Sequence, residues 1–96
     1  MWKLKETANP AEKRQTVDRL KTMVEDLPRQ VDLIKGLEVG INIVRVETAF
    51  DIVAILPFDY WDGLLRYLEH PARTAISEVL GPLREASAVV DYEVSD

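Results

Sequence analysis

Hydrophobic and polar residues follow a regular pattern in six successive segments of the chain. In residues 1–7, Trp2 and Leu4 alternate with lysines, and an alternation of period two is typical of a β-strand. Residues 10–27 instead repeat apolar side chains at the spacing of one helical face: Val17, Leu20, Val24 and Leu27. The chain therefore opens with a predicted strand and a predicted amphipathic helix.

The sequence also marks the two ends of this helix. Asn9 can accept hydrogen bonds from the first free N–H groups, and Pro10 lacks an N–H at a position where it would go unpaired. Glu12 completes a capping box with Asn9. We expect Pro28 to end the helix, because proline interrupts the helical hydrogen bonds.

Two strands are predicted next. Residues 31–46 hold an alternating segment that includes Ile43 and Val44, and Gly40 within it is typical of a bulge or a close backbone approach. After a turn at residues 47–49, a third strand follows that is apolar at nearly every position: Phe50, Ile52, Val53, Ala54, Ile55 and Leu56.

A broken helix and a last strand complete the pattern. Asp59 can cap a helix whose apolar stripe consists of Trp61, Leu64, Leu65 and Leu68. The helix should break at His70, because a residue that precedes proline is pushed out of the α region. It resumes over residues 72–80, with four residues expected to face inward: Ala72, Ala75, Ile76 and Val79. Residues 86–94 alternate again and predict the last strand.

The order strand, helix, strand, strand, helix, strand predicts the fold class. It is typical of an α+β, ferredoxin-like βαββαβ fold, in which a four-stranded antiparallel sheet carries its helices on one face. The chain has 96 residues, which is room for one domain, so we expect a single domain over residues 1–96.

The third strand also predicts a partner for the sheet. Helices cover only one face, so a sheet with one wet face should alternate apolar and polar residues. Val53 and Ile55 break that rule, because they point away from Ile52 and are apolar too. We expect Val53 and Ile55 to lie in a homodimer interface of more than about 1,200 Å². The alternative is that they are strand-favouring residues on an open surface.

Composition narrows the classes of partner. The sequence has 12 Lys and Arg against 17 Asp and Glu, and the basic residues are interleaved with acidic ones, so we expect no nucleic-acid partner. There is no cysteine, which excludes disulfides and thiolate metal sites and suits a cytoplasmic location. The single histidine and the dispersed carboxylates do not form a ligand cluster, so we expect no metal site. The sequence has no Gly-rich phosphate-binding loop, so we expect no cofactor. No apolar run approaches the roughly 20 residues of a membrane span, so we expect no membrane partner.

Tyr67, His70 and Arg73 form the candidate site, because residues three apart are neighbours on one side of a helix. In the functional interpretation they line a pocket between helices and sheet. Arg73 binds a carboxylate or enolate, Tyr67 donates a hydrogen bond, His70 transfers a proton, and Trp61 lies at the pocket mouth. In the structural interpretation His70 satisfies a backbone group at the helix break, Tyr67 and Trp61 are packing aromatics, and Arg73 is solvated.

Four segments resemble the stress-responsive dimeric α/β-barrel family, and they occur in the order of that family. Residues 2–5 and 36–42 are similar to its first two strands, residues 67–71 to its helix break, and residues 89–94 to its last strand. The resemblance implies a ferredoxin-like fold and a homodimer that closes into a barrel. It implies no single activity, because the family includes plant stress proteins as well as a cofactor-free polyketide cyclase.

Two departures from the family bear on activity. Members commonly carry a Lys-His pair in the first strand, and this sequence has no histidine there. The helix break usually continues His-Pro-x-His, but Arg73 stands at the second histidine, and a guanidinium cannot act as a base near neutral pH. Tyr67 matches the tyrosine of the cyclase.

We therefore expect a stress-responsive homodimer of undefined biochemical role that binds a small apolar or aromatic ligand. One alternative is a cofactor-free cyclase or isomerase that uses Tyr67 and His70, with Arg73 holding an anion. A second alternative is a small cofactor-free monooxygenase. Whether the protein is an enzyme stays open at this point.

Overall fold

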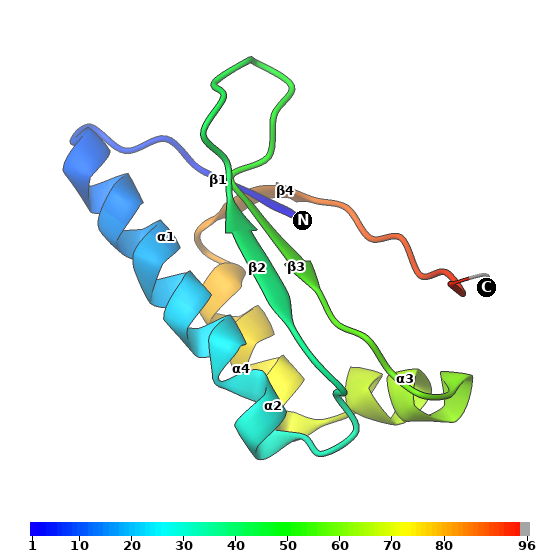
Figure 1. The fold of residues 1–96 in the computed structure, drawn as a ribbon. Helices are drawn as coiled ribbons and strands as arrows, with labels where there is room; N and C mark the ends of the chain where they lie inside the picture. The colour runs from blue at the N-terminus through cyan, green and yellow to red at the C-terminus, as the bar shows by residue number, and fades with distance from the viewer. Residues whose placement is uncertain (95–96) are drawn as a thin grey trace.

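A computed structural model describes residues 1–94 and contains one four-stranded sheet (Figure 1). The strands are β1 (Trp2–Leu4), β2 (Glu38–Ile41), β3 (Ile52–Ile55) and β4 (Arg84–Ser87), and their order across the sheet is β2-β3-β1-β4. Each neighbouring pair is antiparallel. The first strand of the chain therefore lies inside the sheet, between β3 and β4.

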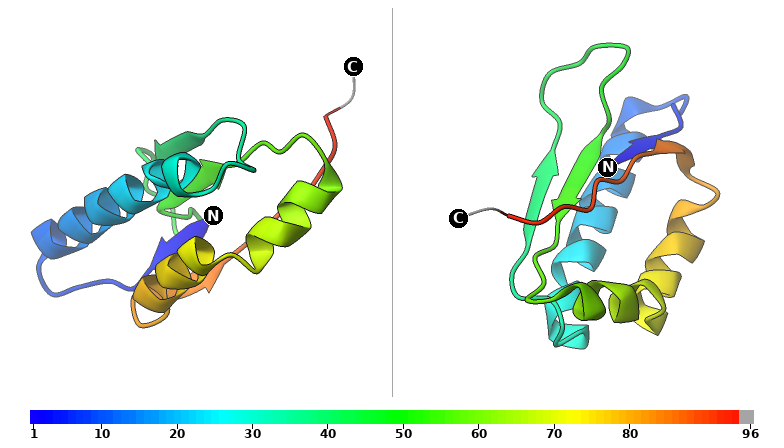
Figure 2. Two further views of the ribbon diagram at one scale, coloured as in Figure 1. Left: turned by 90° about the horizontal axis from the view of Figure 1, so that it is seen from below. Right: turned by 90° about the vertical axis from the view of Figure 1, so that its right-hand side faces the viewer.

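The helices cover one face and one end of this sheet. They are α1 (Pro10–Glu25), α2 (Leu27–Gln30), α3 (Trp61–Leu68) and α4 (Pro71–Leu80). Helices α1 and α4 lie side by side over one face, whereas α3 lies beyond the end of the sheet (Figure 2). This arrangement confirms the predicted α+β, ferredoxin-like βαββαβ fold. No helix within residues 1–94 is long and apolar enough to cross a membrane.

The hydrophobic core fills the space between the sheet and these helices. Leu4 from β1, Leu20 from α1 and Ile52 from β3 are each no more than 2% exposed. The stripe predicted for α1 is confirmed, because Val17, Leu20, Val24 and Leu27 are all buried. Full burial of one such side chain contributes about 1.5–3 kcal/mol. In α4, Ala72 and Ile76 are buried as expected, but Ala75 is exposed.

Two predicted helix ends are wrong. Pro28 does not end α1, which stops at Glu25; the proline instead stands in the first turn of α2, where its missing N–H costs nothing. Asp59 does not cap α3 either. The N-cap is Tyr60, and its side chain makes no capping hydrogen bond.

The strands are shorter than predicted. Ile43 and Val44 lie outside β2 in the loop that leads to β3, and are 91% and 64% exposed. The last strand stops at Ser87, and residues 88–94 continue as an extended arm (Figure 1). Alternating residues adopt strand structure only where a neighbouring strand supplies hydrogen bonds, and among the described residues this pairing ends at Ala88, which exchanges backbone hydrogen bonds with Met1.

Candidate functional site

His70 acts as the N-cap of α4. Its backbone is extended, and its Nδ1 atom accepts a hydrogen bond of 3.0 Å from the backbone N–H of Ala72. A neutral imidazole that accepts through Nδ1 carries its proton on Nε2 and has no free lone pair. To take up a proton, His70 would have to give up this cap, so the contact favours its structural role.

Arg73 closes the other side of the helix break. Its Nη1 atom donates a hydrogen bond of 3.1 Å to the carbonyl oxygen of Leu68, the last residue of α3. A cation is favourable there, because the carboxyl end of a helix carries a partial negative charge. The guanidinium therefore satisfies a backbone group at the break.

Tyr67 supplies the phenol of the candidate site. Its half-buried ring packs on Phe58, with ring centroids 5.5 Å apart and planes tilted by 40°. Burial raises the pKa of this phenol, and the nearby charge of Arg73 offsets part of that effect. At neutral pH Tyr67 is a neutral hydrogen-bond donor, not a base.

Trp61 is the first residue of α3. It is 46% exposed, and its indole N–H donates a hydrogen bond of 2.6 Å to a carboxylate oxygen of Glu93 in the extended arm. No residue of α3 is fully buried, and its stripe leaves Leu65 and Leu68 60% and 38% exposed. The apolar face of α3 is therefore available to another surface.

The capping role of His70 predicts the effect of two substitutions. His70→Ala should lower the free energy of unfolding by about 1 kcal/mol, because the first turn of α4 loses its acceptor. His70→Asn should recover most of this loss, because asparagine caps well. Urea denaturation of both variants is the measurement, and equal losses in the two would contradict the role.

The sequence analysis did not predict a charged cluster around a buried lysine. Lys13 of α1 is 8% exposed, and its Nζ atom lies 2.6 Å from Oε1 of Glu6 and 3.3 Å from Oδ1 of Asp51. The other oxygen of Asp51 accepts a hydrogen bond of 2.7 Å from the backbone N–H of Leu4. Burial alone would lower the pKa of Lys13, but the hydrogen bonds and charges of Glu6 and Asp51 raise it above its usual value.

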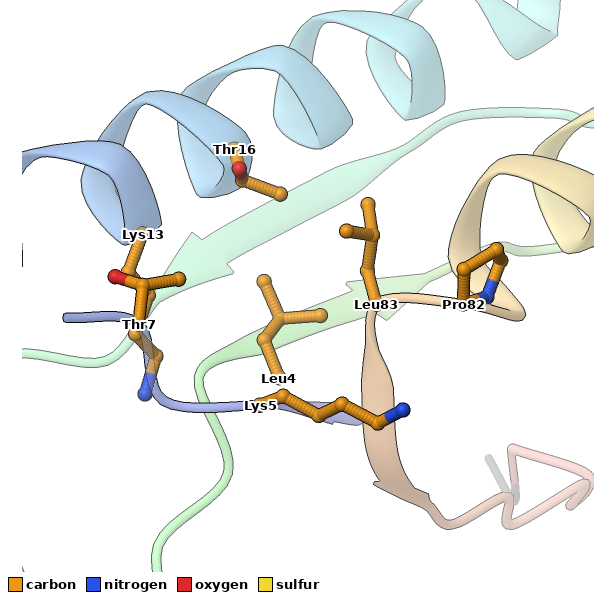
Figure 3. A pocket seen from close by; sticks show the side chains of 7 residues that line it. All are labelled: Leu4, Lys5, Thr7, Lys13, Thr16, Pro82 and Leu83. Atoms are coloured by element: carbon orange, nitrogen blue, oxygen red, sulfur yellow. The ribbon is translucent and has the colours of Figure 1, made fainter. Parts of the chain in front are cut away.

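Two cavities lie away from Tyr67, His70 and Arg73. The first, of about 160 Å³, lies between β1, α1 and the turn before β4, and we call it the β1–α1 cavity (Figure 3). The second, a hollow of about 240 Å³, lies beside β2 and β3 and includes Gly40 and Val53 in its lining. Neither is lined by the three residues of the candidate site.

Comparison with known proteins identifies the class of this domain. The sequence model of the stress responsive A/B barrel domain matches residues 1–94, and the chain belongs to that family. A comparison with curated proteins gives no match.

Solved structures give the same result for the fold. A dimeric protein of unknown function with a ferredoxin-like fold from Bacteroides fragilis is 30% identical, with a TM-score of 0.84, over 97% of this chain and 89% of that one. A dimeric ferredoxin-like protein of unknown function from Thermobifida fusca is 20% identical, with a TM-score of 0.71, over 90% and 77% of the two chains. A protein from Arabidopsis thaliana is 14% identical, with a TM-score of 0.79, over 99% and 90%.

Proposed function

We propose that this member of the stress responsive family works as a homodimer whose two sheets pack face to face and close a barrel. The observation that carries the proposal is the position of Val53 and Ile55. Ile52 is 1% exposed on the helix side of β3, so its neighbour Val53, and Ile55 two positions further, lie on the face that no helix covers. Ile55 is 44% exposed there.

The pattern around these two residues fits an interface. Gly40 of β2 is the register partner of Val53, and a Cβ atom at position 40 would lie 3.2 Å from Cγ1 of Val53. Both residues line the 240 Å³ hollow, which a side chain of a second copy can fill. Charged residues lie on the β4 side of this apolar pair, where Lys3 of β1 and Glu85 of the edge strand β4 are 3.8 Å apart. An apolar centre with a polar rim is the usual anatomy of a protein interface.

Two exposed segments beside the sheet also support a dimer. The loop after β2 exposes Val46, and the arm after β4 exposes four apolar side chains by 66% or more: Val89, Val90, Tyr92 and Val94. Single exposed apolar residues need no explanation, but two such segments beside an uncovered sheet face do. The bacterial relatives described as dimeric support the same assembly.

The test of this proposal is the mass of the protein in solution. Light scattering after size exclusion should give twice the chain mass of 10.9 kDa at micromolar concentration. A mass of one chain at that concentration would contradict the proposal.

A second candidate function is the binding of a small apolar or aromatic ligand at the α3–α4 break. Tyr67 would donate a hydrogen bond from its phenol to the ligand, Trp61 would pack against the ligand, and His70 and Arg73 would line the site. The half-buried, neutral phenol of Tyr67 favours this function over acid–base catalysis, because His70 and Arg73 already hold backbone groups. A cyclase or isomerase would need one of these contacts to open.

The titration of Tyr67 provides a test of its environment. Because burial raises its pKa, Tyr67 should ionise at a higher pH than a tyrosine that is free in water. Ultraviolet absorption of the phenolate should lose its most alkaline step in Tyr67→Phe, with Tyr92→Phe as the matched control. Loss of that step in the control instead would contradict the assignment.

We also propose that residues 1–96 form one domain. The described residues share one hydrophobic core, and the family match spans nearly the whole chain. The lack of cysteine supports a cytoplasmic location as part of this proposal.

A further inference from the structure

The β1–α1 cavity has mainly apolar walls. Leu4 of β1 and Leu83 of the turn before β4 lie side by side in its lining, and the methyl group of Thr16 faces the same space (Figure 3). The hydroxyl of Thr16 is already used, since it donates to the carbonyl of Glu12. The hydroxyl of Thr7, at the other side, likewise donates to the carbonyl of Asn9.

The size of this cavity limits what it can hold. Its volume of about 160 Å³ is close to the roughly 150 Å³ of an engineered apolar cavity that binds benzene. The body of a ligand is therefore restricted to one aromatic ring or a short branched chain.

The two lysines in the lining differ in how their charges are compensated. The ammonium group of Lys13 lies between the carboxylates of Glu6 and Asp51, so this side of the cavity already has a slight excess of negative charge. Lys5 has no carboxylate within 4.0 Å among residues 1–94. Its stem runs along the edge of the cavity below Leu4 (Figure 3). An anionic group would be repelled near Lys13 and attracted near Lys5.

We propose that the β1–α1 cavity binds a small monocarboxylate whose body is a single aromatic ring or a branched aliphatic chain. The body lies between Leu4, Leu83 and the methyl group of Thr16, and the carboxylate lies beside Lys5. This site is separate from the α3–α4 break, because the two lie at opposite ends of α4, whose 10 residues span about 15 Å. The proposal does not depend on ligand binding at Tyr67.

The test compares benzoate with benzyl alcohol, which has a ring of the same size and no charge. Both are titrated into the ¹⁵N-labelled protein, and the amide signals of Leu4, Lys5, Thr16 and Leu83 are followed. Both probes should shift these signals, and benzoate should bind about two- to fivefold more tightly at low salt, as expected for one exposed ion pair. Added salt should remove this advantage and leave the binding of benzyl alcohol unchanged.

Three variants separate the parts of the site. Lys5→Met should reduce the affinity for benzoate to that for benzyl alcohol. Lys35→Met is the matched control, because Lys35 pairs with Asp59 and does not line the cavity, and it should change neither affinity. Thr16→Leu fills the space and should abolish the binding of both probes.

Three results would overturn the proposal. The first is the absence of saturable shifts in the folded wild-type protein. The second is equal binding of the two probes in wild type, or an unchanged benzoate affinity in Lys5→Met, because either outcome removes the carboxylate from the site. The third is a set of shifts centred on Phe58 and Tyr67, which would assign the ligand to the helix break instead.

Discussion

The substitution Val53→Asp is expected to dissociate the dimer or unfold the protein. It places a carboxylate at the centre of the uncovered sheet face, and the twofold symmetry of a dimer brings in two such charges at once. Removing each charge from water costs several kcal/mol when no partner compensates it. A net loss of about 4 kcal/mol corresponds to a roughly thousandfold weaker association.

The measurement is the mass in solution of wild type and variant at one concentration. Gln15→Asp is the control, because it adds the same charge on an exposed position of α1. The control should keep the mass of the wild type. A Val53→Asp protein that kept this mass as well would place the interface elsewhere on the molecule.

Among substitutions of single charged side chains, Asp51→Ala is expected to cause the largest loss of stability. The carboxylate serves the Leu4 N–H and the ammonium of Lys13 together, and both groups lie in poorly solvated positions. Without this carboxylate the buried N–H of Leu4 loses its acceptor and the buried ammonium of Lys13 loses one of its two partners. We therefore expect the free energy of unfolding to fall by about 3 kcal/mol. For a domain of this size that corresponds to a melting temperature roughly 15 °C lower.

Glu6→Ala supplies the comparison within the same cluster. Glu6 also contacts Lys13, but its side chain is 78% exposed, so water can replace it and the loss should stay below about 1 kcal/mol. Thermal melts of both variants should be made at one protein concentration, because dimer formation contributes to the melting temperature. Equal losses of stability in the two variants would contradict the larger contribution that we expect from Asp51.

The same cluster predicts how stability changes with pH. Because the pKa of Lys13 is raised on folding, the charged lysine stabilises the fold fully at pH values below its unfolded pKa. This contribution should disappear as the pH rises through the pKa of Lys13 in the folded state. The wild type should therefore be more stable than a Lys13→Met variant at neutral pH, and this difference should shrink only in strong alkali. Denaturation at pH 7 and at pH 11 checks the direction.

The order of elements could be predicted from the sequence because periodicity reports which face of an element is buried. The stripe from Val17 to Leu27 predicted α1, and the proline after His70 predicted the break between α3 and α4. Strand ends could not be predicted in this way. Residues 88–94 alternate as a strand does, but pairing requires a neighbouring strand, and periodicity does not report whether one is present.

The sequence predicted that the residues of the candidate site are neighbours, but it did not predict their hydrogen-bond partners. Spacing placed Tyr67, His70 and Arg73 beside the helix break, and the structure places them there. Spacing does not report which polar atoms the backbone at the break already uses. The cluster around Lys13 left one signal, because Lys13 lies four residues before Val17 and so continues the buried stripe of α1.

The position of β1 inside the sheet has a consequence for synthesis on the ribosome. Among the strands β1 is made first, yet both its neighbours come later, β3 at residues 52–55 and β4 at residues 84–87. The four-stranded sheet therefore cannot close before residues 84–87 have been synthesised, and until then β1 can pair only with β3. A nascent chain that stalls before Arg84 leaves one edge of β1 open to pairing with other chains, so it should be a substrate for chaperones that protect unpaired strands.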